Sequence, residues 1–193
     1  YPALYYGNTP FYGQSPFYHS GASGESAVLD FVLPDAVALS GKVTNQAADP
    51  VYNIDVNVEE FDSGEGLVGT RTAPDGSYRL YVMPGLDYRV RVDAWQMPQY
   101  LNQYYVQAYT WQEATRIVGV PVPANKQINN IDLVIGGPAY LDGKVTDHNG
   151  VGIAGMQVRA LDMATYSTPF PGAETDANGN FHLALPPNRQ FKV

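Results

Sequence analysis

Four acidic residues lie close together in the chain and form its densest group of candidate metal ligands: Glu59, Glu60, Asp62 and Glu65. Calcium binds several carboxylate and carbonyl oxygens at once, so this composition is typical of a calcium site. Successive side chains of a strand point to opposite faces, and this separates Glu59 from Glu60 if both lie in one strand. Solvated carboxylates in a turn are therefore the simpler interpretation.

A second candidate for calcium is the DxNxN run formed by Asp176, Asn178 and Asn180. The same run is typical of a tight turn, because Asp and Asn side chains accept hydrogen bonds from nearby backbone amides. We expect no bound metal and no other cofactor. The residues that would bind calcium if a site existed are Asp62, Glu65, Asp176 and Asn178.

Catalytic chemistry has little support in the sequence. The three histidines, His19, His148 and His182, are far apart and fall in different predicted elements. No GxSxG, HExxH or phosphate-binding glycine loop is present, and the Ser and Asp residues show no triad spacing. The sequence therefore predicts a protein that is not an enzyme.

Aromatic residues are concentrated in residues 1–18 and again in residues 100–111. Such residues stack on sugar rings, or form interfaces in which a rigid ring gives a large contact area with little loss of entropy. Packing inside a module is the third interpretation, because both runs precede similar strand patterns. The candidates for an interface or for ligand stacking are Tyr1, Tyr5, Tyr6, Phe11, Tyr12, Phe17, Tyr18, Tyr104, Tyr105 and Trp111.

The composition limits both the fold and the possible partners. The 193 residues include 15 Tyr, 19 Gly and 15 Pro, which favours many short strands joined by turns. The absence of Cys excludes disulfides, so that stability must come from a core or from assembly. A net charge of -8 with scattered Lys and Arg argues against nucleic acid, and no apolar run is long enough to span a membrane.

The chain repeats itself with a period of about 100 residues, which suits a β-sandwich module. Residues 73–90 and 176–193 share a Gly after Asp or Asn, then an aromatic residue, a leucine, a proline, an aromatic residue and a valine. The other matching segments are 39–45 with 141–147, 28–33 with 130–135, and 1–7 with 100–106.

Residues 36–135 contain every element of this repeat and predict a complete module. Alternating apolar residues predict strands near 39–43, 54–59, 67–72, 78–82, 88–92, 114–120 and 128–135. We expect seven antiparallel strands with one buried and one solvated face per sheet, and no helix beyond a turn within 98–112. The charged residues between the apolar ones, Lys42, Arg89 and Arg91 among them, should then face solvent.

Residues 136–193 predict the first five strands of a further module, and residues 1–35 predict the aromatic connection and last strands of a preceding one. The chain is then either a piece of a longer tandem array, or a subunit whose two ends are completed by other copies. An unfinished sandwich exposes strand edges and half a core, which added strands from a neighbour would cover.

The pattern resembles the carboxypeptidase-regulatory-like domains, which belong to the transthyretin-like (prealbumin-like) sandwiches and are related to collagen-adhesin B-type repeats. The matching positions are Gly41–Thr44, Asp75–Tyr78, Pro84–Val90, Gly143–Thr146, Asn178–Phe181 and Pro187–Val193. The resemblance implies tandem Greek-key β-sandwich modules, one complete and two partial. It also implies spacers, stalks or binding modules on secreted and surface proteins.

We therefore expect an extracellular or cell-surface structural protein whose modules join head-to-tail into a filament or stalk, with strand complementation between copies as one route. Its partners would be other copies of itself or adjacent modules of a longer chain. The alternatives are an adhesin module that binds carbohydrate or a surface, and the accessory domains of a larger secreted enzyme. We expect no nucleic-acid partner and no membrane span in this segment.

Overall fold

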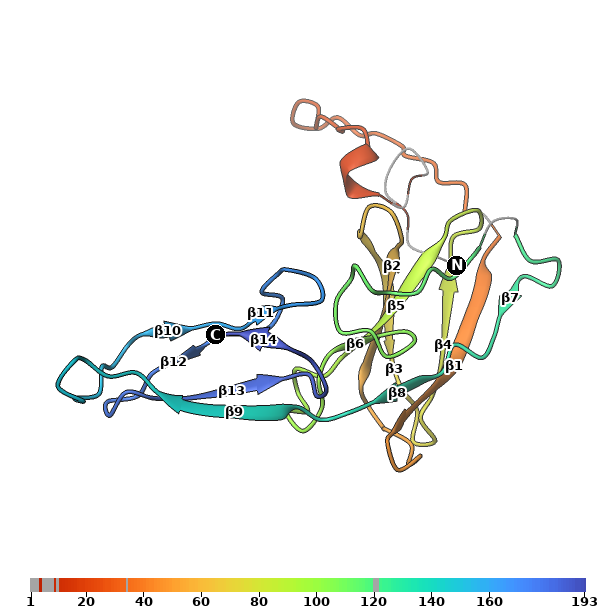
Figure 1. The fold of residues 1–193 in the computed structure, drawn as a ribbon. Helices are drawn as coiled ribbons and strands as arrows, with labels where there is room; N and C mark the ends of the chain where they lie inside the picture. The colour runs from red at the N-terminus through yellow and green to blue at the C-terminus, as the bar shows by residue number, and fades with distance from the viewer. Residues whose placement is uncertain (1–3, 5–8, 10, 34, 120–121) are drawn as a thin grey trace.

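The computed structural model of the chain is all-β, which confirms the predicted fold class (Figure 1). It describes residues 4, 9, 11–33, 35–119 and 122–193. Within these residues the helical structure is one short turn, η1 (Tyr12–Gln14). None of the helical structure in that part of the chain is long and apolar enough to cross a membrane. The strands form two units, which Figure 1 shows extending away from each other.

The first unit consists of two sheets packed on a common core. One sheet has the order β4-β1-β7, with β8 also paired to β1, and the other has the order β3-β2-β5-β6. The strands are β1 (Val37–Asn45), β2 (Asp55–Glu60), β3 (Gly66–Arg71), β4 (Ser77–Val82), β5 (Tyr88–Asp93), β6 (Gln103–Tyr104), β7 (Gln127–Ile128) and β8 (Leu133–Ile135).

The core of the first unit follows the alternation of apolar residues in the sequence. Leu39 and Val43 of β1 are fully buried, and the alternating apolar residues of β2, β4 and β5 are buried with them. The turn before β4 forms because Gly76 has a positive φ of 75° and Asp75 accepts a hydrogen bond from the Ser77 amide at 3.0 Å. The predicted strands at 39–43, 54–59, 67–72, 78–82 and 88–92 are thus confirmed within one or two residues.

Two of the seven predicted strands differ from the structure. Residues 114–120 form no named strand in their described part and contribute a single bridge between Ile117 and Tyr88. Residues 128–135 divide into β7 and β8, because the backbone turns at Asn130, where φ is 62°. Both pieces run parallel to β1, which differs from the antiparallel pairing that the sequence predicts.

The second unit has the strands β9 (Ala139–Lys144), β10 (Gln157–Val158), β11 (Leu161–Asp162), β12 (Ala173–Glu174), β13 (Asn180–Leu185) and β14 (Phe191–Lys192). Its pairings are β9 with β13, β10 with β12, and β11 with β14. A small core contains Val158, Ala160, Leu183 and Leu185.

The two units share their strand register. In the first, Gly41 of β1 lies opposite Tyr78 of β4, and in the second, Gly143 of β9 lies opposite Phe181 of β13. Each unit also contains a buried threonine, Thr72 or Thr175, whose hydroxyl donates to one backbone carbonyl and accepts from one backbone amide. In each unit the hydroxyl therefore links two loops, the one before β4 or β13 and the one before β2 or β10.

The described part of residues 1–35 contains no named strand, although the repeat predicted strands there. Residues 28–33 belong to none of the described sheets, and their large apolar side chains are exposed: Val28, Leu29, Phe31, Val32 and Leu33. The matching residues Ile131, Leu133 and Ile135 are buried beside β1. The same sequence pattern therefore has two environments in this structure.

Candidate functional site

The aromatic candidates of residues 1–18 are only partly described. Tyr1, Tyr5 and Tyr6 lie outside the described residues, and the side chain of Tyr12 is outside them as well. Phe11 is half-buried, whereas Phe17 and Tyr18 are 90% and 51% exposed. The role of this segment in stacking or in an interface stays a prediction.

The other three aromatic candidates belong to the part of the first unit that follows β5. Tyr105 is half-buried and packs against the first core. Tyr104 in β6 lies beside the guanidinium of Arg91, with 5.9 Å between the guanidinium carbon and the ring centroid. Trp111 is 57% exposed, and the Arg89 guanidinium lies 5.4 Å from its ring centroid.

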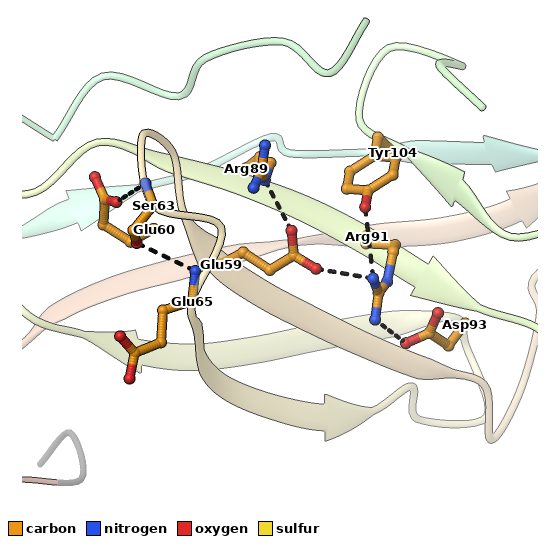
Figure 2. A network of polar contacts seen from close by, with 8 residues as sticks. All are labelled: Glu59, Glu60, Ser63, Glu65, Arg89, Arg91, Asp93 and Tyr104. Atoms are coloured by element: carbon orange, nitrogen blue, oxygen red, sulfur yellow. Dashed lines mark hydrogen bonds and ion pairs between the residues drawn. The ribbon is translucent and has the colours of Figure 1, made fainter. Parts of the chain in front are cut away.

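A charged cluster lies under these rings, and Figure 2 shows Glu59 at its centre. The Glu59 carboxylate accepts a hydrogen bond from Arg89 Nε at 2.8 Å and pairs with Arg91 Nη1 at 2.9 Å. Arg91 also pairs with Asp93 at 2.9 Å and donates to the Tyr104 hydroxyl at 3.5 Å. Glu59 and Arg89 are both buried.

The position of Arg89 corrects the sequence prediction, which placed this residue on a solvated face. The connection after β5 folds back over that face and places the Trp111 ring near the Arg89 guanidinium, and the ring of Phe61, which follows β2, lies near it as well. Burial alone would lower the pKa of Arg91. Hydrogen bonds to Tyr104 and Asp93, together with the charges of Asp93 and Glu59, outweigh burial and raise its pKa. The cluster is therefore held as neutralised ion pairs.

The calcium candidates are not brought together. Asp62 pairs with Arg116 at 2.5 Å, and the Glu65 amide donates to Ser63 at the neighbouring turn. Asp176 accepts hydrogen bonds from the Asn178 and Asn180 amides, which is turn geometry. In the described part of the chain, no group of three or more His, Asp or Glu residues is placed to hold a metal ion.

The lysines and histidines occupy separate surface positions. Lys42 is exposed, as the alternation of apolar residues predicted, and Lys144 of β9 is exposed as well. His182 pairs with Asp142 at 2.6 Å and stacks on Tyr140, whereas His19 and His148 are exposed in other segments.

The joint between the two units contains a charged contact that sequence reasoning missed. Arg189, just before β14, contacts both carboxylate oxygens of Glu113 in the first unit, at 2.5 and 2.6 Å. Its other terminal nitrogen donates to Asp162 of β11 at 2.5 Å, and Asp162 is fully buried. The Tyr109 ring lies 5.3 Å from the guanidinium. Glu113, Arg189, Asp162 and Tyr109 are called the joint cluster below.

Burial alone would lower the pKa of Arg189, but the hydrogen bonds to Glu113 and Asp162 and the charges of these carboxylates raise it. Burial raises the pKa of Tyr109, and the Arg189 charge opposes this shift. The arginine therefore stays charged and links the first unit to a buried acid of the second.

A cavity of about 470 Å³ lies beside the joint cluster. The first unit contributes Trp95, Tyr100, Tyr104, Tyr109 and Trp111 to its walls, and the second contributes Pro169, Phe170 and Pro171. The polar residues in its lining include Asn102, Thr110 and Arg91, which belongs to the charged cluster.

Comparisons with known proteins do not assign the chain to a family. No protein-family model and no curated protein matches the chain. Similar solved structures include a 9R-lipoxygenase from Cyanothece PCC8801, with 17% identity over 65% of this chain and 21% of that chain at a TM-score of 0.36. The Bacillus anthracis TIE protein has 11% identity over 82% of this chain and 28% of that chain, at a TM-score of 0.34.

The shaft pilin SpaA from Lactobacillus rhamnosus GG has 8% identity over 82% of this chain and 89% of that chain, at a TM-score of 0.39. The chain thus spans 21% and 28% of the lengths of the lipoxygenase and the TIE protein. At these identities and TM-scores the likenesses assign neither a family nor a function, and the transthyretin-like resemblance stays a prediction.

Proposed function

We propose that this chain is a non-enzymatic structural segment of an extracellular or cell-surface protein, in which β-sandwich modules are joined in series by rigid joints. The observation that carries the proposal is the joint cluster, in which Arg189 of the second unit contacts Glu113 of the first at 2.5 Å. A flexible linker would not need such a contact, whereas a stalk or filament depends on a fixed angle between its modules.

The energetics of the joint support a fixed angle. Asp162 is fully buried, and its carboxylate also accepts a hydrogen bond from the Ala164 amide at 2.9 Å. Removing Arg189 would leave this carboxylate buried without its charged partner, which costs roughly 3–5 kcal/mol in comparable buried pairs. Part of that free energy holds the two units together, because Arg189 contacts Glu113 and Asp162 at once.

The repeated apolar segment, buried in one copy and exposed in the other, supports the addition of further modules to the array. Residues 28–33 expose their large side chains, whereas the matching residues 130–135 lie buried beside β1. A large exposed apolar segment is typical of an interface. We therefore propose that this segment is covered in the assembled array, by an adjacent module or by another copy through strand complementation.

Distance measurements between the units test the rigid joint. The chain contains no Cys, so that Ala73→Cys in the first unit and His148→Cys in the second allow two spin labels to be attached at exposed positions. Electron–electron double resonance should give one narrow distance distribution. Arg189→Ala in the same background should broaden it, whereas the matched control Arg79→Ala, an exposed arginine of β4, should leave it narrow. A broad distribution in the parent protein would contradict the proposal.

Assembly is tested separately on protein isolated from its natural surface. Electron microscopy should show filaments or stalks with a regular axial repeat. Isolated compact particles at every concentration, with unchanged exposure of residues 28–33 to amide exchange, would contradict assembly and leave the rigid joint standing.

A further inference from the structure

The walls of the joint cavity are unusual in composition. Trp95 and Trp111, the two tryptophans of the chain, both line it, together with three tyrosines and Phe170. Trp95 and Trp111 are 71% and 57% exposed, so that they present open ring surface to solvent. Prolines from both units complete the walls and cannot donate backbone hydrogen bonds.

The polar groups of the cavity carry no net charge. Arg91 is the charged residue in the lining, and with Arg89, Glu59 and Asp93 it forms a cluster of two positive and two negative side chains. Asn102 uses its carbonyl oxygen to accept from the Ala94 amide at 2.7 Å, which leaves its amide nitrogen as a further donor. The cavity therefore offers hydrogen-bond donors to a ligand that is neutral and rich in acceptors.

We propose that this cavity binds a small neutral saccharide. The apolar face of a sugar ring fits against exposed Trp and Tyr rings, and its hydroxyls match donors such as those of Asn102 and Tyr104. Local neutrality and the net charge of -8 on the chain both disfavour an anionic ligand. The volume of 470 Å³ lies near the lower end of the ~300–1,000 Å³ range of small-molecule sites, which is too small for a peptide of several residues.

Both units build the site, so this inference depends on the rigid joint of the proposed function. The aromatic rings belong mainly to the connection after β5, whereas Pro169, Phe170 and Pro171 close the cavity from the second unit. Arg189 lies outside the lining but fixes the two units against each other. Ligand affinity should therefore depend on a residue that does not contact the ligand.

Intrinsic fluorescence provides a direct test, because both tryptophans of the chain line the cavity. Glucose, galactose, mannose, N-acetylglucosamine, cellobiose and lactose are each titrated up to tens of millimolar. At least one should give a saturable change, confirmed by saturation-transfer NMR. Trp111→Ala should lower affinity about tenfold through loss of ring contact. The matched control Tyr166→Ala, an exposed ring of the second unit outside the lining, should retain it.

Three outcomes would overturn the proposal. The first is the absence of a saturable change with every sugar in a protein whose spin-label distances show the rigid joint. The second is saturable binding of indole without binding of any sugar, which would identify an aromatic-ligand pocket. The third is unchanged sugar affinity in Arg189→Ala, which would exclude a site built by both units. The spin-label distances decide the proposed function independently of all three.

Discussion

The pairs β1–β4 and β9–β13 have the same register, yet they bury very different amounts of side chain. Leu39 of β1 is fully buried, whereas Leu141 at the same register position of β9 is 38% exposed. β1 also pairs with β7 and β8, and the described residues contain no corresponding strand beside β9. Register is therefore set by the two strands and their turn, whereas burial depends on the strand added on the other side.

Substituting leucine at the shared position should give the largest difference between the units. We expect Leu39→Ala to lower the free energy of unfolding by about 2–5 kcal/mol, because it leaves a cavity in a closed core. Leu141→Ala should lower it by about 1 kcal/mol or less, because much of that side chain is already in water. Urea denaturation followed by circular dichroism measures both. Equal losses would show that β9 is as well covered as β1.

The second largest difference in stability should come from the glycines at the shared register position, Gly41 and Gly143. A Cβ at Gly41 would lie 2.0 Å from the Ile131 carbonyl oxygen, which is backbone held by β1. A Cβ at Gly143 would instead meet the Phe181 ring at 2.3 Å, and a half-buried ring can rotate away. We expect Gly41→Ala to cost about 1–3 kcal/mol of unfolding free energy and Gly143→Ala clearly less. The reverse order in the same urea experiment would contradict the close approach of Ile131.

The aromatic residues opposite these glycines give a smaller and more specific effect. The Tyr78 hydroxyl donates to the Ile131 carbonyl at 2.6 Å, and burial raises the pKa of Tyr78. Tyr78→Phe should cost about 1–2 kcal/mol of unfolding free energy, because it leaves a buried carbonyl without this donor. Phe181→Tyr should change stability little, since the described residues contain no strand on the other side of β9 that could supply a matching carbonyl. A gain in Phe181→Tyr would reveal an acceptor beside β9.

The elements that sequence reasoning predicted well are those set by local patterns. The alternation of β1, β2, β4 and β5 and the turn at Asp75 and Gly76 depend on neighbouring residues, and these were correct. The split of 128–135 was missed because it depends on how Ile131 pairs with Ser40, a residue distant in sequence. Parallel pairing with β1 was missed for the same reason.

The candidate site was harder to predict, because its residues meet only in the folded chain. Arg89 alternates with apolar residues and therefore looked solvated, until the connection after β5 covered it. Arg189, Glu113 and Asp162 come from three separate segments, and no spacing links them. The aromatic candidates Tyr104 and Trp111 do line the joint cavity. The concentration of aromatic residues in the sequence therefore indicated this part of the site.

The smallest expected effect concerns the turns that set the common register. Asp75 accepts hydrogen bonds from Ser77, and Asp176 accepts hydrogen bonds from Asn180. In the repeat Asn180 matches Ser77, whereas Asp176 stands two positions before the residue that matches Asp75. Hydrogen bonds from the Ser77 side chain and amide lower the pKa of Asp75 below 3.8, and those from the Asn180 side chain and amide lower that of Asp176. Because these pKa values are lower in the folded protein, the stabilisation is present above about pH 4 and is lost as pH falls through the folded values.

Asp75→Asn and Asp176→Asn should therefore each lower the urea midpoint slightly at pH 6 and leave it unchanged at pH 2. Both carboxylates are exposed, so that water and salt screen their contribution. Similar losses for the two variants would show that the turn acts locally and independently of how well each unit is covered. A difference from the parent protein that persists at pH 2 would instead assign the effect to packing of the turn rather than to its charge.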